Sequence, residues 1–363
     1  MILSESLIDG LADTLEERIM LPEHSHQKTR QTGRGARQLS YATVLSMLVL
    51  LIIPALAADE PKVHNPTGNH VEVRNDIPLF GDLQFRRGFN LSYPSSTHGR
   101  NVAAVLRADG ETRTPLWRLC QWGTQHSLAD AAPILSPAGL RFENAAKRVM
   151  IAGSPADRLD LILDIRGGVE YGQHMRKQGE AWPHLLIEQD ALERYPLTEL
   201  SNVRLQLDLR LLSLSDNAPE TSDPRLHSAQ FQLFLVVKNI AEGSPDYRNF
   251  YWFGVPFFDR RYDFSPPHMA RDQGKKHATG KFIYTIAGKE VLTTSMKQKR
   301  WVYVDRNLLP SILAGLREAV SRGYLKSDNP REYAVANMNL GWELPGNYDA
   351  AIQLRNLKLS VSK

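Results

Sequence analysis

The sequence predicts an all-β protein built as a two-sheet β-sandwich, with one helix at about residues 308–322. Apolar and polar residues alternate without a fault along 203–211, which is the period of a strand with one buried face. Residues 230–237 repeat the alternation at first and then become apolar on both faces. A single segment has the spacing of an amphipathic helix. Many strands with one late helix are typical of a sandwich or jelly roll rather than of an alternating α/β fold.

The remaining strand candidates are apolar and aromatic runs separated by turn signals. The alternation at 203–211 changes phase at Leu212, as a β-bulge would cause. Turns are expected at 216–219, 266–267 and 345–347, which are rich in Pro, Gly, Asn and Asp. Further strands are expected at Trp117–Trp122, Leu159–Ile165, His184–Glu188, Phe250–Phe257, Lys281–Ile286, Trp301–Val304 and Ala350–Val361.

The predicted helix has apolar residues at three- and four-residue spacing. Asp305 or Asn307 can cap its start, and Gly323 can end it. Its buried face would consist of Leu309, Ile312, Leu313, Leu316 and Val320.

The 363-residue chain has an ordinary globular composition and a formal charge of +4. Its basic residues are interleaved with acidic ones and form no concentrated stripe in a recognisable module, so no nucleic-acid partner is expected. Cys120 is the only cysteine, which excludes an intrachain disulfide and a thiolate zinc cluster. Its neighbours Leu119 and Trp122 predict a buried, unreactive thiol.

Residues 41–57 have the layout of a secretory signal peptide. An uncharged apolar run at 42–53 follows Arg34 and Arg37 and leads to a small-x-small end at Ala57. The run is shorter than the about 20 apolar residues that a membrane span needs. We therefore predict cleavage after Ala57, a secreted or periplasmic location, and no stable membrane insertion after cleavage.

The domain boundaries follow from this leader. Residues 1–57 form the leader, whose polar start is either never translated or the cytoplasmic tail of an uncleaved anchor. Residues 58–77 are rich in Pro, Asn, Gly and His and predict a flexible lead-in. Residues 78–363 show no internal repeat and no linker, and predict a single β-sandwich domain.

The common catalytic and cofactor motifs are missing. The sequence has no G-x-S-x-G elbow, no phosphate-binding loop, no G-x-G-x-x-G and no H-E-x-x-H. His174 with His184, or His268 with His277 and Asp272, could meet around a metal, but neither spacing requires it. We expect no metal and no cofactor.

Three segments place aromatic rings beside carboxylates or Arg at expected strand ends. Flat rings can support the apolar face of a pyranose, while carboxylate, amide and guanidinium groups bind hydroxyls. We therefore predict a polysaccharide or oligosaccharide as the partner. The predicted contacts are Trp182, Tyr251, Trp252, Trp342 and Arg260, with Glu343, Glu188 and Asp259 as candidate catalytic carboxylates. The alternative is that these tryptophans are core or rim residues of the sandwich.

A second polar row lies on the strand at 203–211. Arg204, Gln206, Asp208 and Arg210 share one face, which Gln230 and Gln232 on another strand could continue. This row could form the floor of a glycan-binding groove, but a solvated outer face is the preferred interpretation.

The C-terminal part resembles the end of family 12 glycoside hydrolases. A helix containing Leu309-Pro310-Ser311-Ile312 is followed by 321–325, by Gly341-Trp342-Glu343 and by a last strand. That family consists of endoglucanases and xyloglucanases with a concanavalin-like β-jelly roll and a catalytic Glu in a Gly-aromatic-Glu segment. The resemblance covers about residues 300–361 and implies Glu343 as the acid/base. The family's nucleophile strand would align with 249–258, which contains no carboxylate.

Hydrolysis by two carboxylates needs a partner for Glu343, and Glu188, Asp208 and Asp259 are the candidates. The preferred hypothesis is a secreted carbohydrate-active enzyme, either a hydrolase or a lyase. A carbohydrate-binding or cell-envelope interaction protein on the same fold is the alternative. A structural envelope component held by an uncleaved anchor is a third hypothesis.

Overall fold

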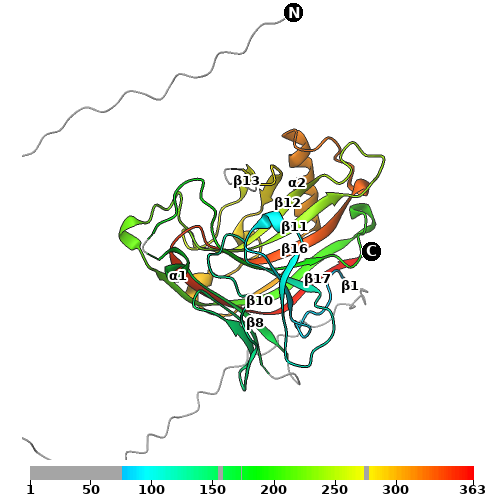
Figure 1. Ribbon diagram of the computed structural model, residues 1–363. Coiled ribbons are helices and arrows are strands. Elements are labelled where there is room, and N and C mark those ends of the chain that lie inside the picture. Colours follow the sequence, from blue (N-terminus) through cyan, green and yellow to red (C-terminus); the bar gives the residue numbers. More distant parts are fainter. Residues whose placement is uncertain (1–75, 154–157, 173, 274–277) are drawn as a thin grey trace, which may run out of the picture. The chain divides into compact units, whose positions relative to one another are not determined.

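The computed structural model describes residues 76–153, 158–172, 174–273 and 278–363, which belong to one compact unit, residues 70–363. Within these residues the chain forms two stacked sheets, one of eight strands and one of nine (Figure 1). The predicted all-β sandwich is confirmed. The predicted leader, its cleavage site and residues 58–75 of the predicted lead-in lie outside the described residues. No helix in the described part is long and apolar enough to cross a membrane.

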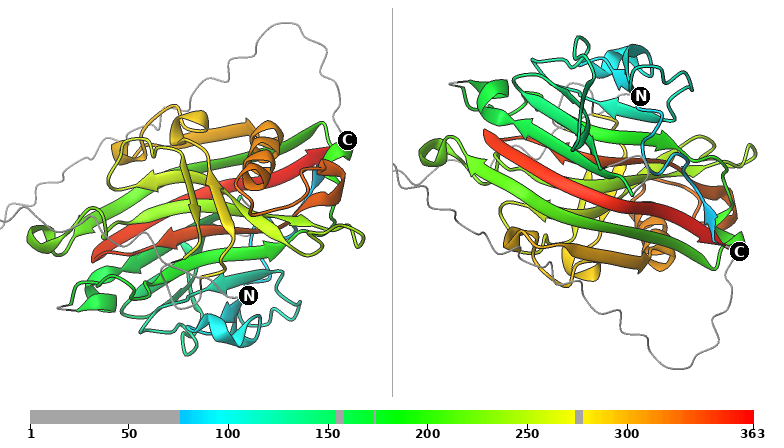
Figure 2. Two further views of the ribbon diagram at one scale, coloured as in Figure 1. Left: turned by 90° about the horizontal axis from the view of Figure 1, so that it is seen from above. Right: turned by 90° about the horizontal axis from the view of Figure 1, so that it is seen from below.

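The eight-stranded sheet is built around the two longest strands, which run antiparallel side by side (Figure 2). In order, its strands are β15 (Val302–Asn307), β10 (Asn202–Asp216), β17 (Tyr348–Ser362), β8 (Asp160–Arg166), β7 (Lys147–Ala152), β6 (Gly139–Glu143) and β5 (Ile134–Ser136), with β1 (Ile77–Pro78) also paired to β17. Ile77, the last residue of the predicted lead-in, pairs with Val361 and thus belongs to the sheet.

The nine-stranded sheet mixes antiparallel and parallel pairs. In order, its strands are β13 (His268–Arg271), β14 (Phe282–Thr285), β12 (Phe250–Asp259), β11 (Gln230–Asn239), β16 (Tyr333–Glu343), β9 (His184–Asp190), β4 (Trp117–Cys120), β2 (Phe89–Ser92) and β3 (Val102–Leu106). Short 3-10 turns lie at Ser96–His98, Leu197–Glu199, Pro219–Thr221, Gly288–Glu290, Met296–Gln298 and Pro330–Glu332.

The core lies between the sheets and follows the predicted alternation. Leu205, Leu207 and Leu209 of β10 are buried, while Arg204 and Gln206 point outward. The predicted phase change at Leu212 is present as a register shift between Leu211 and Ser213. The outward row of β10 forms ion pairs on the outer face of its sheet, such as Arg204–Asp305, as the solvated-face interpretation expects. Gln230 and Gln232 do not continue this row, because β11 belongs to the other sheet.

Two helices accompany the sheets. The predicted helix is α2 (Leu309–Ser321), which contacts β10, β12 and β14 beside the edge strand β15. Gly315 lets α2 approach closely, because a Cβ there would lie 2.9 Å from the Tyr284 ring. The short helix α1 (Gly167–Tyr171) was not predicted; it follows β8 and contacts β17.

Candidate functional site

The outer face of the nine-stranded sheet carries a cleft of about 870 Å³. Side chains of β9, β16, β11 and β12 form its floor, and they alternate with core residues because successive residues of a strand point to opposite faces. Residues 94–96 and 122–123 form one wall, and residues 262–273 around β13 form the other. The volume is within the range of ligand-binding clefts.

Strand register places four polar side chains in one row across this floor. Glu343 pairs with His184 of β9 and with Gln230 of β11. Gln230 in turn pairs with Asp259 of β12. Directly paired residues point to the same face, so all four reach the cleft. Glu343 and Asp259 are two strand spacings apart, about 10 Å between their Cα atoms.

Glu343 accepts hydrogen bonds from two donors and lies beside the His184 imidazole. The Trp182 indole N–H donates to Oε2 at 3.1 Å, and the Gln232 amide donates to Oε1 at 3.1 Å. The His184 Nε2 atom lies 3.5 Å from the same Oε2. These donors stabilise the carboxylate form. The Glu343 side chain is 16% exposed, so it is accessible from the cleft although it is well packed.

The orientation of His184 is fixed by backbone carbonyls. Its Nδ1 atom lies 2.8 Å from the Trp182 carbonyl oxygen and 3.2 Å from that of Trp122. A carbonyl can only accept, so Nδ1 carries the hydrogen and Nε2 faces Glu343. The position of Nε2 at the cleft floor, beside the Glu343 carboxylate, is therefore set by two backbone carbonyls.

The carboxylate of Asp259 accepts hydrogen bonds from three neighbouring residues. It accepts from the Ser228 hydroxyl at 2.8 Å, from the Gln230 amide at 2.9 Å, and from the Arg261 guanidinium and backbone N–H. Burial raises the pKa of Asp259, but the hydrogen bonds from Arg261 and Ser228 outweigh it and leave the pKa below its ordinary value. Asp259 therefore orients Gln230 and Arg261 and is a poor proton donor.

Aromatic rings stand on both sides of the cleft. Trp122 and Trp182 lie on the side of β9, and Trp252 and Tyr262 on the side of β12. The Trp182 ring stacks with the His184 imidazole, at 5.8 Å between centroids and 19° between planes, and the Arg176 guanidinium lies over it at 5.1 Å from its centroid. Trp252 is partly exposed, and its indole N–H donates to Thr279. Tyr262 is 41% exposed.

Two predicted contact residues, Tyr251 and Trp342, are core residues instead. Both are fully buried. The Tyr251 hydroxyl donates to the Ile312 carbonyl of α2, and the Trp342 indole donates to Leu163 of the opposite sheet. Each precedes a cleft residue in its strand and must therefore point to the other face. The prediction that they bind sugar is wrong.

Two further predicted residues lie outside the cleft lining. Glu188 is paired with Arg118 and lies 3.8 Å from Arg100, so its carboxylate is neutralised by guanidinium groups. Arg260 packs over the Tyr348 ring at 4.7 Å and contacts Asp216 at 3.5 Å, whereas its neighbour Arg261 lines the cleft. Their predicted catalytic and sugar-binding roles find no support in these positions.

Sequence reasoning did not name Trp122, Tyr262 or Arg261 as site residues, and it singled out His184 only as a possible metal ligand. The strand period held part of the missing signal. Trp122 is the last residue of an expected strand, and His184 lies two residues before Leu186, so His184 and Leu186 both point to the cleft face of β9. Among the residues that the structure describes, no three His, Cys, Asp or Glu side chains cluster as a metal site would require.

Neither a family model nor a curated protein sequence matches the chain significantly. Solved structures that are similar include a native family 12 xyloglucanase from Bacillus licheniformis, with 9% identity, a TM-score of 0.36 and coverage of 64% of this chain and 97% of that one. An endoglucanase from Rhodothermus marinus has 11% identity, a TM-score of 0.34 and coverage of 64% and 96%. A family 11 xylanase from Neocallimastix patriciarum has 8% identity, a TM-score of 0.32 and coverage of 64% and 95%. Family 12, which the C-terminal segment resembles, is thus among these distant structural neighbours.

Proposed function

We propose that this protein binds a polysaccharide chain along the cleft of the nine-stranded sheet. One observation carries the proposal: Trp182, Trp252 and Glu343 are far apart in the sequence, yet all three line the same cleft. We also propose that the protein works outside the cytoplasm, as residues 41–57 predict. This proposal would be supported if N-terminal sequencing found Ala58 as the first residue of the exported protein.

The composition of the cleft suits a sugar polymer. Rings on both walls can support the apolar faces of pyranoses, while the polar groups of the floor bind hydroxyls. The volume of about 870 Å³ suits several linked sugars better than one. Arg261 is neutralised by Asp259, and Glu343 supplies a negative charge, so we expect a neutral glycan to bind better than a uronate polymer.

Glycoside hydrolysis is the second candidate function, because Glu343 presents a hydrogen-bonded carboxylate at the cleft floor. The donors from Trp182 and Gln232 suit a nucleophile or base better than a proton donor. The two-carboxylate route needs an acid as well. Asp259 fits that role poorly, for its pKa is lowered. Asp272 on the opposite wall accepts from Thr279 and is the other carboxylate of the described lining. Binding without turnover is therefore the better-supported function.

The test is a panel of neutral and acidic polysaccharides, screened by affinity electrophoresis and by release of reducing ends. We expect retardation by at least one neutral polysaccharide. Failure to bind any member would contradict the proposal. Turnover that disappears in Glu343→Gln while binding persists would establish hydrolysis, and full turnover in that variant would remove Glu343 from the reaction.

A further inference from the structure

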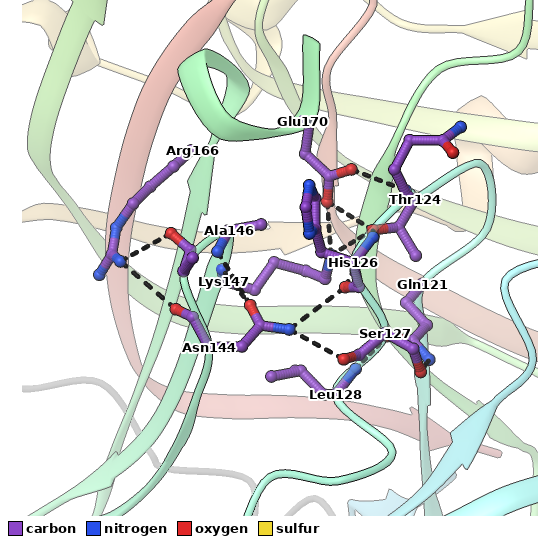
Figure 3. Close-up of polar contacts among 12 residues, drawn as sticks. Gln121, Thr124, His126, Ser127, Leu128, Asn144, Ala146, Lys147, Arg166 and Glu170 are labelled. Carbon is purple, nitrogen blue, oxygen red and sulfur yellow. Dashed lines mark hydrogen bonds and ion pairs between the residues drawn. The ribbon is translucent and has the colours of Figure 1, made fainter. Parts of the chain in front are cut away.

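A buried ion pair lies beneath one wall of the cleft. The side chains of Lys147, at the start of β7, and Glu170, on α1, are 0% and 1% exposed. Lys147 Nζ lies 2.5 Å from Glu170 Oε1 (Figure 3). Burial lowers the pKa of Lys147 despite this partner, so the pair sits in a strongly desolvated place. Replacing such a pair by apolar residues often leaves stability unchanged, so stability alone is a weak reason for it.

The pair reaches the segment 121–128. The Thr124 hydroxyl donates to Glu170 and accepts from Lys147 (Figure 3). The Gln125 backbone N–H donates to Glu170 Oε2 at 2.8 Å. Asn144 holds the same segment, because its side-chain amide donates to the Ser127 carbonyl at 2.8 Å. Glu170 thus satisfies a backbone donor of this segment directly.

This segment continues directly into the cleft wall. Trp122 and Gly123 precede Thr124, and both line the cleft. The Trp122 carbonyl accepts from the His184 backbone N–H at 2.8 Å. Gly123 has φ +73°, and a Cβ there would lie 2.2 Å from the Trp182 carbonyl oxygen. A shift of this wall would therefore move the ring of Trp122 and press on the backbone that orients His184.

The same short helix also supports the Glu343 side. The hydroxyl of Tyr171, the residue after Glu170, donates to the Leu344 carbonyl at 2.7 Å. Leu344 directly follows Glu343, and its N–H donates to Pro183 at 3.0 Å. Two consecutive residues of α1 thus hold the backbone beside Trp122 and the backbone beside Glu343.

We infer that Glu170, with Lys147 as its counter-ion, is a positioning residue that sets the Trp122 wall and thereby the affinity of the cleft for its glycan. The inference rests on the proposed function. Glu170 touches no ligand; it acts by holding Thr124 and Gln125. What matters is the hydrogen-bonding capacity at position 170 rather than the charge.

Two double variants separate hydrogen bonding from charge. In Lys147→Met/Glu170→Gln, the amide oxygen can still accept from Gln125 and the amide N–H can donate to Thr124. In Lys147→Met/Glu170→Leu, both bonds are lost while charge neutrality and approximate volume are kept. Each variant is compared with the wild type by urea unfolding, by hydrogen exchange over 121–128, and by affinity for the polysaccharide found in the panel.

We expect the Gln variant to keep the exchange protection of Gln125 and an affinity within about twofold of wild type. The Leu variant should lose that protection and bind about tenfold more weakly, because a misplaced wall weakens a preorganised site. If the Leu variant does not fold, Thr124→Val, which keeps the ion pair and the Gln125 bond but removes the side-chain bonds of Thr124 to the pair, should weaken binding in the same direction.

Equal protection and equal affinity in both double variants would overturn the inference. Equal losses in both would overturn it as well, because the charge would then be what matters. A wild-type protein that binds no polysaccharide would instead refute the proposed function. Exchange over 121–128 would in that case still decide whether Glu170 holds this wall.

Discussion

Two tryptophans with similar sequence surroundings should respond to substitution in opposite ways. Trp342 is fully buried, packs edge-on against Phe231 at 5.2 Å between ring centroids, and donates to Leu163. Trp252 lines the cleft and is only partly buried. Substituting the first should change stability, and substituting the second should change glycan affinity.

The magnitudes follow from these surroundings. Truncating a buried Trp to Ala costs about 3–5 kcal/mol, and the loss of its hydrogen bond to the Leu163 carbonyl adds about 1 kcal/mol. That total is a large part of a typical unfolding free energy of about 5–15 kcal/mol, so Trp342→Phe, at about 2–3 kcal/mol, is the usable variant. In Trp252→Ala, losing about 50 Å² of ring surface against a sugar costs about 1.3 kcal/mol, or roughly tenfold in affinity.

Urea unfolding and affinity electrophoresis measure the two effects on the same samples. Trp342→Phe should lower the urea midpoint with unchanged slope and leave affinity within about twofold. Trp252→Ala should weaken binding about tenfold with a smaller change in midpoint. The assignment of cleft and core faces would be refuted if Trp342→Phe weakened binding at unchanged stability, or if Trp252→Ala bound like the wild type.

Three further predictions concern stability and reactivity. The lowered pKa of Asp259 means that this group stabilises the fold above about pH 4 and that its contribution is lost as pH falls through the folded-state value. Asp259→Asn should therefore lower the free energy of unfolding by about 1–3 kcal/mol at neutral pH, and the variant should lose less stability than the wild type below about pH 4. If the unfolding free energies of wild type and variant, measured with urea, ran parallel across pH, this prediction would be contradicted. Gly123→Ala should lower the melting temperature more than Gly110→Ala, because both have positive φ but only the first Cβ meets a backbone atom; equal shifts would show that the contact with Trp182 is unimportant. Burial raises the pKa of the Cys120 thiol, so a thiol reagent at about pH 8 should label it only in denaturant, and rapid labelling of the native protein would place it elsewhere.

The fold class was readable from local patterns. The alternation along β10, the phase change at Leu212 and the amphipathic spacing of α2 each involve neighbours within a few residues. Such patterns depend on which face of one element is buried, and they need no knowledge of its partner. The short strands β2 and β3 were not predicted, because segments of four or five residues show few repeats of the period; β4 and β14 are as short but lie within longer predicted segments.

The site was only partly readable. Adjacent strand residues point to opposite faces, so the sequence already implied that at most one of Trp342 and Glu343, and one of Tyr251 and Trp252, could reach a common cleft. The sequence did not say which residue of each pair faces the cleft. That choice depends on which sheet face meets the second sheet.

A bulge in β12 shows why the tertiary structure was needed. Trp252 and Asp259 are an odd number of positions apart and would point to opposite faces of a regular strand. Gln232 pairs with Pro256 while Phe231 pairs with Phe258, so Phe257 is extra and the phase changes between them. Both side chains therefore reach the cleft. The sequence by itself determined the two-sheet fold and supplied the aromatic and acidic residues. Long-range register, together with this bulge, decided which of them share one cleft, because pairing between distant strands is fixed by contacts that no local pattern records.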